Sequence, residues 1–291
     1  MALHKPPAGV RVKAGQDGGS DGQTHGRDLV RRTVSSVMIV AFIVTGIIAG
    51  GAVWSVIASI AALCSLWELY RLMYTKYRLS RGWGLAGGAF MLLTVSIGLS
   101  YAVTLSIMAM TALIVLFTEI IRRQMTGHSS ALWNMGGTLS GLVYVILPWS
   151  FMILLRSHPD GKQYLLTIFF CTWSCDVAAY AAGTLFGESP MCDRVSPSKS
   201  WEGFAAGVIA SATCGAILPA IFEIAPFPLA ILGALCGVAG QVGDLAESVL
   251  KREAKVKDTG NLIPGHGGFL DRFDSILINA ALTFFIIEVI A

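Results

Sequence analysis

The chain has 291 residues, of which 54% are hydrophobic and only 13% charged, and its mean hydropathy is +0.67. Soluble domains carry about 25% charged residues and could not bury this much apolar surface, so the composition excludes an ordinary water-soluble protein and predicts a membrane protein. The net charge of +3 is too small to argue for or against nucleic acid, and we expect no nucleic-acid partner. The six cysteines lie mostly in apolar segments and are expected to be buried thiols.

The amino-terminal segment differs from the rest of the chain. Residues 1–29 are rich in Gly, Asp, Lys, Gln and Pro and show no periodicity, which predicts a disordered cytoplasmic tail. Three arginines (27, 31 and 32) then precede the first apolar run. An uncleaved first membrane span is therefore expected, with cleavage near 49–52 as the alternative. Residues 30–291 are predicted to form one transmembrane catalytic domain, whose chemistry lies in 171–275.

Apolar stretches recur along that domain and predict an all-α polytopic membrane protein of about nine transmembrane helices. A spanning helix needs about 20 apolar residues, so the first and third stretches are the shortest candidates. The closely spaced pairs are expected to turn at Gly50-Gly51, near Ser100 and at Pro226/Pro228. The nine stretches are 34–49, 52–70, 84–99, 101–120, 134–155, 164–186, 204–222, 227–250 and 275–291.

The basic residues between these stretches predict the orientation. With nine spans and a cytoplasmic amino terminus, 19 of the 21 Lys and Arg residues fall on the cytoplasmic side, and only Arg156 and Lys162 fall outside. Cytoplasmic loops of membrane proteins carry such an excess of positive charge. We therefore expect a multi-pass protein of the inner (plasma) membrane, with a cytoplasmic amino terminus, a periplasmic or outside carboxyl terminus and an active site facing the cytoplasm.

Charged residues are few in the first half of the chain. Glu68 and Glu119 each lie at a predicted helix end, just before basic residues. The simplest interpretation makes them interfacial carboxylates that pair with Arg71 and with Arg122 or Arg123.

The sixth apolar stretch carries an acid in its interior. Asp176, Tyr180, Gly183 and Gly187 form one stripe of a helix. A carboxylate costs about 2.5–3.5 kcal/mol on insertion into a membrane, so we favour a functional role for Asp176 over a structural one. The two glycines are better explained by close helix packing.

The loop that follows, 196–203, reads Ser-Pro-Ser-Lys-Ser-Trp-Glu-Gly. Ser200 is placed to cap the next helix, whose first amides would then favour an anion. Ser196, Lys199 and Ser200 are therefore candidate phosphate-binding residues. A plain capping loop is the alternative.

The eighth stretch ends with Asp244, Glu247, Ser248, Lys251 and Arg252, which share one helical face. The acids lie deeper and the cations nearer the cytoplasm. A salt-bridge ladder from Glu247 to Lys251 is the alternative interpretation, but it leaves Asp244 unexplained.

The densest group of polar residues lies in 257–275. A glycine-rich turn at 264–268 would let backbone N–H groups approach an anion. Carboxylates then share a helical face at the start of the ninth stretch, with cations beside them. This combination is what Mg²⁺–nucleotide chemistry needs. The candidates are Lys257, His266, Gly267, Gly268, Asp271, Arg272 and Asp274.

The segment from Ser248 to Asp274 resembles the signature of the CDP-diacylglycerol synthases, also called phosphatidate cytidylyltransferases. It reads Ser, any residue, apolar, Lys-Arg, four residues and Lys-Asp, and later Pro-x-His-Gly-Gly-apolar-x-Asp-Arg-apolar-Asp. The Asp176 stripe and the 196–203 loop resemble other blocks of that family. Two departures occur, because Ser198 stands where the family usually has Lys and Ser200 where it often has Thr.

The resemblance implies transfer of a cytidylyl group from CTP to phosphatidic acid, which gives CDP-diacylglycerol and pyrophosphate. It implies Mg²⁺, with K⁺ as a candidate second ion, together with a homodimer and contact with membrane lipids. Asp244, Lys251, Arg252, Asp271 and Arg272 would be catalytic. Substrate would be bound by Ser196, Lys199, Ser200, Ser248, Lys257, His266, Gly267 and Gly268, and metal by Asp244, Asp271, Asp274 and Asp176.

Two other functions remain open on the sequence. A CTP-dependent lipid kinase of the polyprenol type would transfer the γ-phosphate instead. An anion transporter would favour inverted repeats and a site at the membrane midplane, and we find neither.

Overall fold

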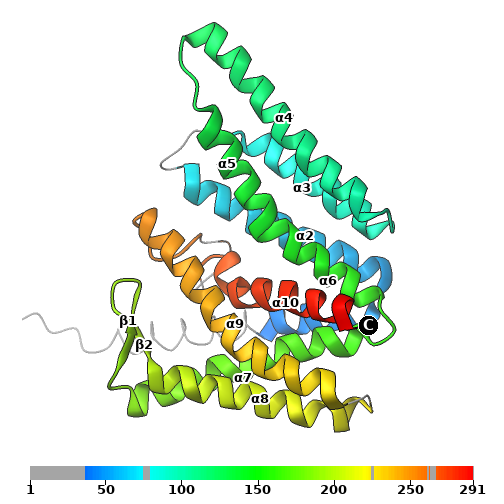
Figure 1. The fold of residues 1–291 in the computed structure, drawn as a ribbon, viewed down its shortest axis with the longest axis vertical. Helices are drawn as coiled ribbons and strands as arrows, with labels where there is room; N and C mark the ends of the chain where they lie inside the picture. Colours follow the sequence, from blue (N-terminus) through cyan, green and yellow to red (C-terminus); the bar gives the residue numbers. More distant parts are fainter. Residues whose placement is uncertain (1–36, 75–78, 224–225, 261, 263–266, 291) are drawn as a thin grey trace, which may run out of the picture.

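The computed structural model describes residues 37–74, 79–223, 226–260, 262 and 267–290. Within these residues, each of the nine predicted apolar stretches forms a helix (Figure 1). The helices are Val37–Ala49, α2 (Gly51–Tyr74), α3 (Arg81–Ser96), α4 (Tyr101–Thr126), the continuous helix made of α5 (Ala131–Gly141), η1 (Leu142–Ile146) and α6 (Leu147–Ser157), α7 (Gly161–Phe186), α8 (Trp201–Phe222), α9 (Pro226–Glu253) and α10 (Asp274–Ile290).

Helix length divides these elements into two groups. In the described part of the chain six helices, counting Ala131–Ser157 as one, are long and apolar enough to cross a membrane. The helix Val37–Ala49 is shorter, and so are α3 with 16 residues and α10 with 17. A helix rises about 1.5 Å per residue, so 17 residues cover roughly 25 Å and fall short of a 30 Å hydrocarbon layer. The protein is therefore a helical membrane protein with six clear spanning helices.

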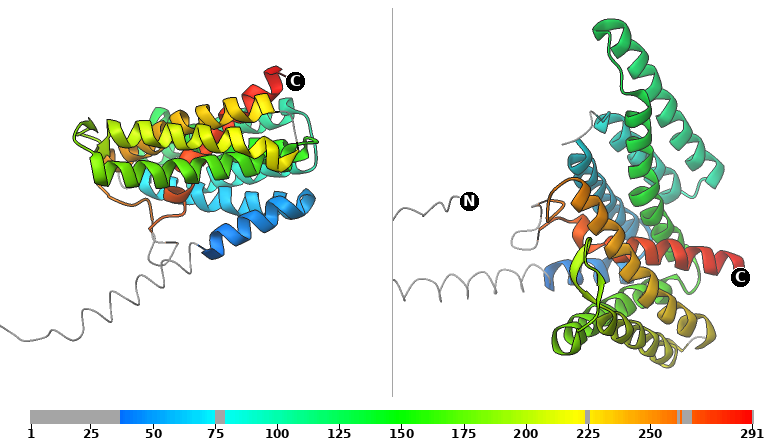
Figure 2. Two further views of the ribbon diagram at one scale, coloured as in Figure 1. Left: turned by 90° about the horizontal axis from the view of Figure 1, so that it is seen from below. Right: turned by 60° about the vertical axis from the view of Figure 1, so that its left-hand side comes forward.

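The helices form two groups that α10 connects. Helices α7, α8 and α9 pack together, whereas α2, α3 and the Ala131–Ser157 helix form the other group, with α4 lying against α3 (Figures 1 and 2). Helix α10 contacts α6, α7 and α9, so it lies between the two groups. Its amino-terminal end therefore brings residues from both halves of the chain together.

Small residues allow α7, α8 and α9 to approach closely. Gly203, Gly207, Ser211 and Gly215 recur every four residues and are all buried on one face of α8. The hydroxyl of Ser211 donates to the carbonyl of Gly233 on α9 at 2.7 Å. This is the small-residue packing that membrane helices use where apolar burial gives no net attraction.

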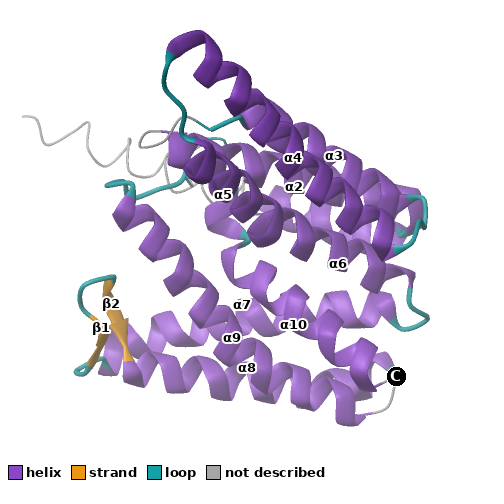
Figure 3. Ribbon diagram, turned by 45° about the horizontal axis from the view of Figure 1, so that its top comes forward, coloured by secondary structure: helices purple, strands orange, loops and turns teal. Residues whose placement is uncertain are grey.

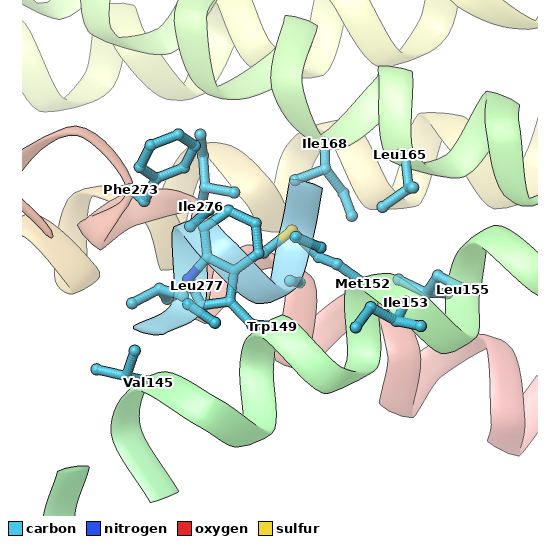
Figure 4. Close-up of a cluster of buried hydrophobic side chains, with 14 of the residues drawn as sticks. Val145, Trp149, Met152, Ile153, Leu155, Leu165, Ile168, Phe273, Ile276 and Leu277 are labelled. Carbon is cyan, nitrogen blue, oxygen red and sulfur yellow. The ribbon is translucent and has the colours of Figure 1, made fainter. Parts of the chain in front are cut away.

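The start of α10 is fixed by an aromatic core. Figure 4 shows Trp149 of α6 directed toward Phe273 and Leu277. The ring centroids of Trp149 and Phe273 lie 5.1 Å apart. The ring of Phe269 stacks on that of Phe273 at a centroid distance of 4.8 Å. Phe273 lies between Arg272 and Asp274, so burying its ring holds the polar residues on either side of it in place.

The turn at Gly50-Gly51 agrees with the sequence, whereas Pro226 and Pro228 lie within α9 and residues 224–225 before them are outside the described residues; the 187–203 loop contains strands that the sequence did not predict. Gly50 and Gly51 both adopt positive φ, as the tight turn there requires. Strands β1 (Pro190–Cys192) and β2 (Ser196–Ser200) form an antiparallel hairpin, shown in orange in Figure 3. The expectation of an all-α chain therefore holds for the membrane helices and was wrong for this short loop, where cross-strand backbone pairing replaces an irregular segment.

Candidate active site

The polar residues of the carboxyl-terminal half meet at one end of the helix bundle. The hairpin, the carboxyl-terminal end of α9 and the amino-terminal end of α10 all lie at the end opposite the carboxyl terminus (Figures 1 and 3). Between them is a cavity of about 490 Å³, which we call the polar cavity. Its polar lining includes Asp176, Tyr180, Ser198, Lys199, Ser200, Gln241, Asp244, Lys251, Asp258, Asp271, Arg272, Asp274 and Ser275.

Three carboxylates form a compact cluster, of which Asp244 and Asp274 line this cavity and Glu247 lies behind them. Asp244, Glu247 and Asp274 each offer an oxygen atom within 4.8 Å of the others. Glu247 is fully buried, and its Oε1 atom has no hydrogen-bond partner among the described residues. Two helices, α9 and α10, supply the cluster. Three converging hard oxygen donors with an unpaired buried oxygen fit a divalent cation well.

Asp271 lies apart from this cluster. Its Oδ1 pairs with the Lys251 ammonium at 2.9 Å, and its Oδ2 accepts the backbone N–H groups of Thr259 (3.0 Å) and Gly268 (2.8 Å). Partial burial by itself raises the pKa of Asp271, but Lys251 and the two N–H donors outweigh it and hold the pKa below its ordinary value. The carboxylate is therefore ionised at neutral pH and holds the loop in place.

The predicted common helical face of Asp271 and Asp274 is absent. Asp271 belongs to a short 3₁₀ helix, η2 (Leu270–Arg272), whereas Asp274 begins α10. Phe273 separates the two with a φ of −122°, so the backbone changes direction between them. The two side chains consequently reach different partners.

The adjacent cations Lys251 and Arg252 have different positions. Lys251 joins Glu247 and Asp271, each at 2.9 Å, so the Glu247–Lys251 pair of the alternative interpretation exists and extends to the loop. Arg252 is exposed and donates from Nε to the carbonyl of Val195 in the hairpin at 3.0 Å. Lys251 lines the polar cavity and Arg252 does not.

The hairpin brings a lysine to the acid cluster. Lys199 pairs with Asp244 at 2.7 Å and also donates to the Gln241 carbonyl at 3.3 Å. Ser200 accepts the Gly203 N–H at 3.1 Å, so the predicted cap of α8 is confirmed. Ser196 pairs with Cys192 within the hairpin and does not line the polar cavity.

The remaining predicted residues occupy different positions. Asp176 lines the cavity together with Tyr180 and Gly183, in agreement with the prediction that these residues share one stripe of a helix. Ser248 is buried on α9, and Lys257 is exposed; neither lines the cavity. Gly268 donates its N–H to Asp271, and Gly267 has a φ of +85°. His266 lies outside the described residues.

A second, largely apolar cavity of about 330 Å³ adjoins the first. It lies between the helix Val37–Ala49, α7 and the start of α10, and Ile39, Ile43 and Trp173 are among its lining residues. Asp176, Asp271, Arg272, Asp274 and Ser275 line both cavities. That the first helix borders the site could not be read from the sequence, because no charged residue marks that helix.

The interpretation of Glu68 as an interfacial partner of Arg71 was wrong. Glu68 is fully buried, and its Oε2 accepts the backbone N–H of Leu270 at 2.8 Å. Arg71 instead lies over the Trp67 ring, 5.5 Å from its centroid. Contacts between residues about 200 positions apart leave no local sequence pattern, which is why this partner was missed. For Glu119 the predicted pairing with Arg122 is confirmed, but the carboxylate is buried rather than exposed.

Comparison with known proteins identifies the family to which the sequence of this chain belongs. The sequence profile of the cytidylyltransferase family matches residues 30–290. A phosphatidate cytidylyltransferase of Staphylococcus saprophyticus is 30% identical over 255 residues, which cover 84% of this chain and 94% of the relative. One from Rickettsia bellii is 36% identical over 168 residues, covering 55% and 71%. One from Brucella suis is 40% identical over 152 residues, covering 51% and 56%.

Proposed function

Because the chain belongs to the cytidylyltransferase family, we propose that it is a phosphatidate cytidylyltransferase. The reaction joins CTP to phosphatidic acid and yields CDP-diacylglycerol and pyrophosphate. The observation that carries the proposal is the polar cavity, where Asp244 and Asp274 of the acid cluster line the same space as Lys199, Lys251 and Arg272. Clustered oxygen donors beside cations suit a metal-bound triphosphate.

The chemistry requires little from a general base. A phosphate oxygen of phosphatidic acid attacks the α-phosphorus of CTP, and the bond from that phosphorus to the β-phosphate bridging oxygen breaks. Pyrophosphate leaves with the electron pair. Because the attacking oxygen is already anionic near neutral pH, the barrier is mainly repulsion between anions, which positioning and electrostatics lower.

Asp244, Glu247 and Asp274 would hold Mg²⁺, with Asp176 facing the same cavity. When bound, the ion would neutralise charge on the phosphates, and K⁺ remains a candidate second ion. Asp271 is engaged by Lys251 and two N–H groups, so we assign it to holding the loop and Lys251. This assignment adds Glu247 to the predicted metal ligands and gives Asp271 a positioning role in place of the predicted ligand role.

The cations would then bind the substrate phosphates. Lys199, Lys251 and Arg272 line the cavity, and Ser200 presents its hydroxyl there beside the first turn of α8. The adjoining apolar cavity shares Asp271, Arg272 and Asp274 with it, which supports entry of the lipid substrate from the membrane. Arg252 would act through the hairpin. The substrate-binding roles of Ser248, Lys257, His266 and Gly267 stay predictions from the family resemblance, and of these Ser248 and Lys257 do not line the cavity.

The membrane arrangement is proposed on the charge pattern. The six long helices and the three shorter ones (Val37–Ala49, α3 and α10) would together make nine spans. Nine spans would place the amino terminus and the active site at the cytoplasmic face. The carboxyl terminus would lie outside the inner membrane. The family resemblance supports a homodimer.

Isotope position in CTP tests the reaction. Purified protein with phosphatidic acid and Mg²⁺ should transfer label from the α-phosphate of CTP into the lipid product. When only the γ-phosphate is labelled, the label should leave in pyrophosphate and the lipid should stay unlabelled. Entry of γ-label into lipid would establish the lipid-kinase alternative. Transport of an anion without either transfer would establish the transporter alternative.

A further inference from the structure

Glu68 is a buried carboxylate that lies outside the polar cavity yet contacts the loop beside it. It lies near the carboxyl-terminal end of α2, in the first half of the chain, and is fully buried. An ionised carboxylate that leaves water must gain strong hydrogen bonds, because burial without them is costly. Both of its described hydrogen bonds go to the segment between α9 and α10, residues 254–273, which we call the active-site loop.

The contacts of Glu68 join the two ends of that loop. Oε2 accepts the Leu270 N–H at 2.8 Å and the Thr259 hydroxyl at 3.4 Å. Oε1 lies against Gly260 so closely that a Cβ there would collide with the carboxylate. Thr259 precedes the glycine-rich turn and Leu270 follows it, so one side chain fixes both the entry and the exit of the turn.

The same two positions set the geometry of Asp271. Leu270 is the first residue of η2, and Asp271 is the second. Asp271 in turn accepts the Thr259 N–H at 3.0 Å and pairs with Lys251 at 2.9 Å. Thr259 is thus held from one side by Glu68 through its hydroxyl and from the other by Asp271 through its N–H.

We propose that Glu68 is a positioning residue for nucleotidyl transfer, which fastens the active-site loop to the first-half helices and thereby places Asp271 and Lys251. The inference rests on the proposed function of the polar cavity. Glu68 touches none of the expected reacting atoms. Its effect is transmitted by the Leu270 N–H and by Thr259. A displacement of reacting groups by about 1 Å costs on the order of a hundredfold in rate, so a loose loop slows turnover.

Another buried carboxylate provides a matched control. Glu119 on α4 is also almost fully buried, and it accepts the Ser130 N–H at 2.8 Å and the Asn134 amide at 2.7 Å. It fastens α4 to the start of α5 and does not line either cavity. Glu119 also pairs with Arg122, so the variant Glu119→Gln removes a buried and well-bonded carboxylate without touching the active-site loop.

The experiment compares Glu68→Gln, Glu68→Ala and Glu119→Gln in the full-length protein. The glutamine keeps an acceptor for Leu270 but loses the charge, so kcat should fall about tenfold for Gln and about a hundredfold for Ala, with a small change in KM for CTP. Glu119→Gln should keep kcat near the wild-type value. Amide hydrogen exchange provides a second readout, in which Leu270 should exchange faster in the Glu68 variants than in Glu119→Gln.

Each outcome decides for or against the positioning role of Glu68. Folded Glu68 variants with wild-type kcat and unchanged exchange at Leu270 would overturn it, as would equal losses in Glu119→Gln, which would indicate general destabilisation. If Glu68→Ala does not accumulate, Thr259→Val removes the hydroxyl and retains the shape, and Thr259→Ser should restore activity. Failure of the wild type to transfer label from the α-phosphate of CTP to lipid would instead contradict the proposed function. The exchange measurement would still test whether Glu68 fastens the active-site loop.

Discussion

At the scale of single residues, the three clustered carboxylates differ in their partners. Asp244 pairs with Lys199 at 2.7 Å and Glu247 with Lys251 at 2.9 Å, while Asp274 accepts the Ser275 N–H at 2.6 Å. Carboxylate oxygens within 4.8 Å of one another repel when ionised. The cluster therefore stores electrostatic strain that a bound cation would relieve, as expected of a site selected for binding rather than for stability.

This repulsion leads to a prediction for Asp244→Asn and Asp274→Asn. Each change keeps the side-chain size and removes one negative charge, so the melting temperature in detergent should stay the same or rise. Loss of a catalytic metal ligand should lower kcat about a thousandfold or more. Both quantities are measured across a Mg²⁺ titration, with Asp193→Asn in the exposed hairpin turn as control. Near wild-type turnover by the two cluster variants would refute the metal assignment.

At the scale of elements, the β1–β2 hairpin joins a structural role to a binding role. Ser200 ends β2 and caps α8, while Lys199 beside it reaches Asp244. Arg252 on α9 donates to the Val195 carbonyl and so ties the hairpin to the helix that carries two of the three acids. The hairpin is therefore fixed over the polar cavity from both α8 and α9.

Substitutions at Ser200 should separate these two roles. Ser200→Ala removes the cap and should cost about 1 kcal/mol of stability. Ser200→Asp preserves a capping oxygen, so the melting temperature should be retained, but its charge should repel the nucleotide phosphates and raise KM for CTP. Ser200→Thr is the conservative control, and melting curves with CTP saturation measure both effects. A wild-type KM for Ser200→Asp would show that Ser200 acts only as a cap.

At the scale of the whole molecule, the ends of the helices define two faces. Arg156, one of the two basic residues expected outside, donates from Nε to the Ile47 carbonyl at 2.7 Å, near the end of the helix Val37–Ala49. A cation at a helix carboxyl terminus satisfies free carbonyls and interacts favourably with the helix dipole. Its position away from the basic loops thus has a structural cause and does not weaken the predicted orientation.

The orientation is tested by single cysteines in a background without the six native ones. Positions 160 and 193 lie on opposite sides of α7, which spans Gly161–Phe186. An impermeant thiol reagent added to intact cells should label Asp160→Cys and should leave Asp193→Cys, and Ser80→Cys between α2 and α3, unlabelled until the membrane is opened. The opposite pattern would invert the topology, and labelling of both positions from outside would contradict the assignment of α7 as a span.

The sequence by itself determined the helices and most of the chemistry. Apolar runs and glycine turns depend on neighbours in the chain, so the nine helices and the turn at Gly50-Gly51 were readable directly. The cap of Ser200, three residues from Gly203, and the pair of Glu247 with Lys251 were equally local.

Only the tertiary structure decided which acids meet. The backbone change at Phe273 turns Asp274 toward Glu247 and Asp271 toward Lys251, and the packing of Phe273 on Trp149, more than a hundred residues earlier, fixes that change. Glu68 likewise meets Leu270 only because α2 packs beside η2. Such contacts depend on how helices assemble, and the side chains involved carry no local pattern that records their distant partners.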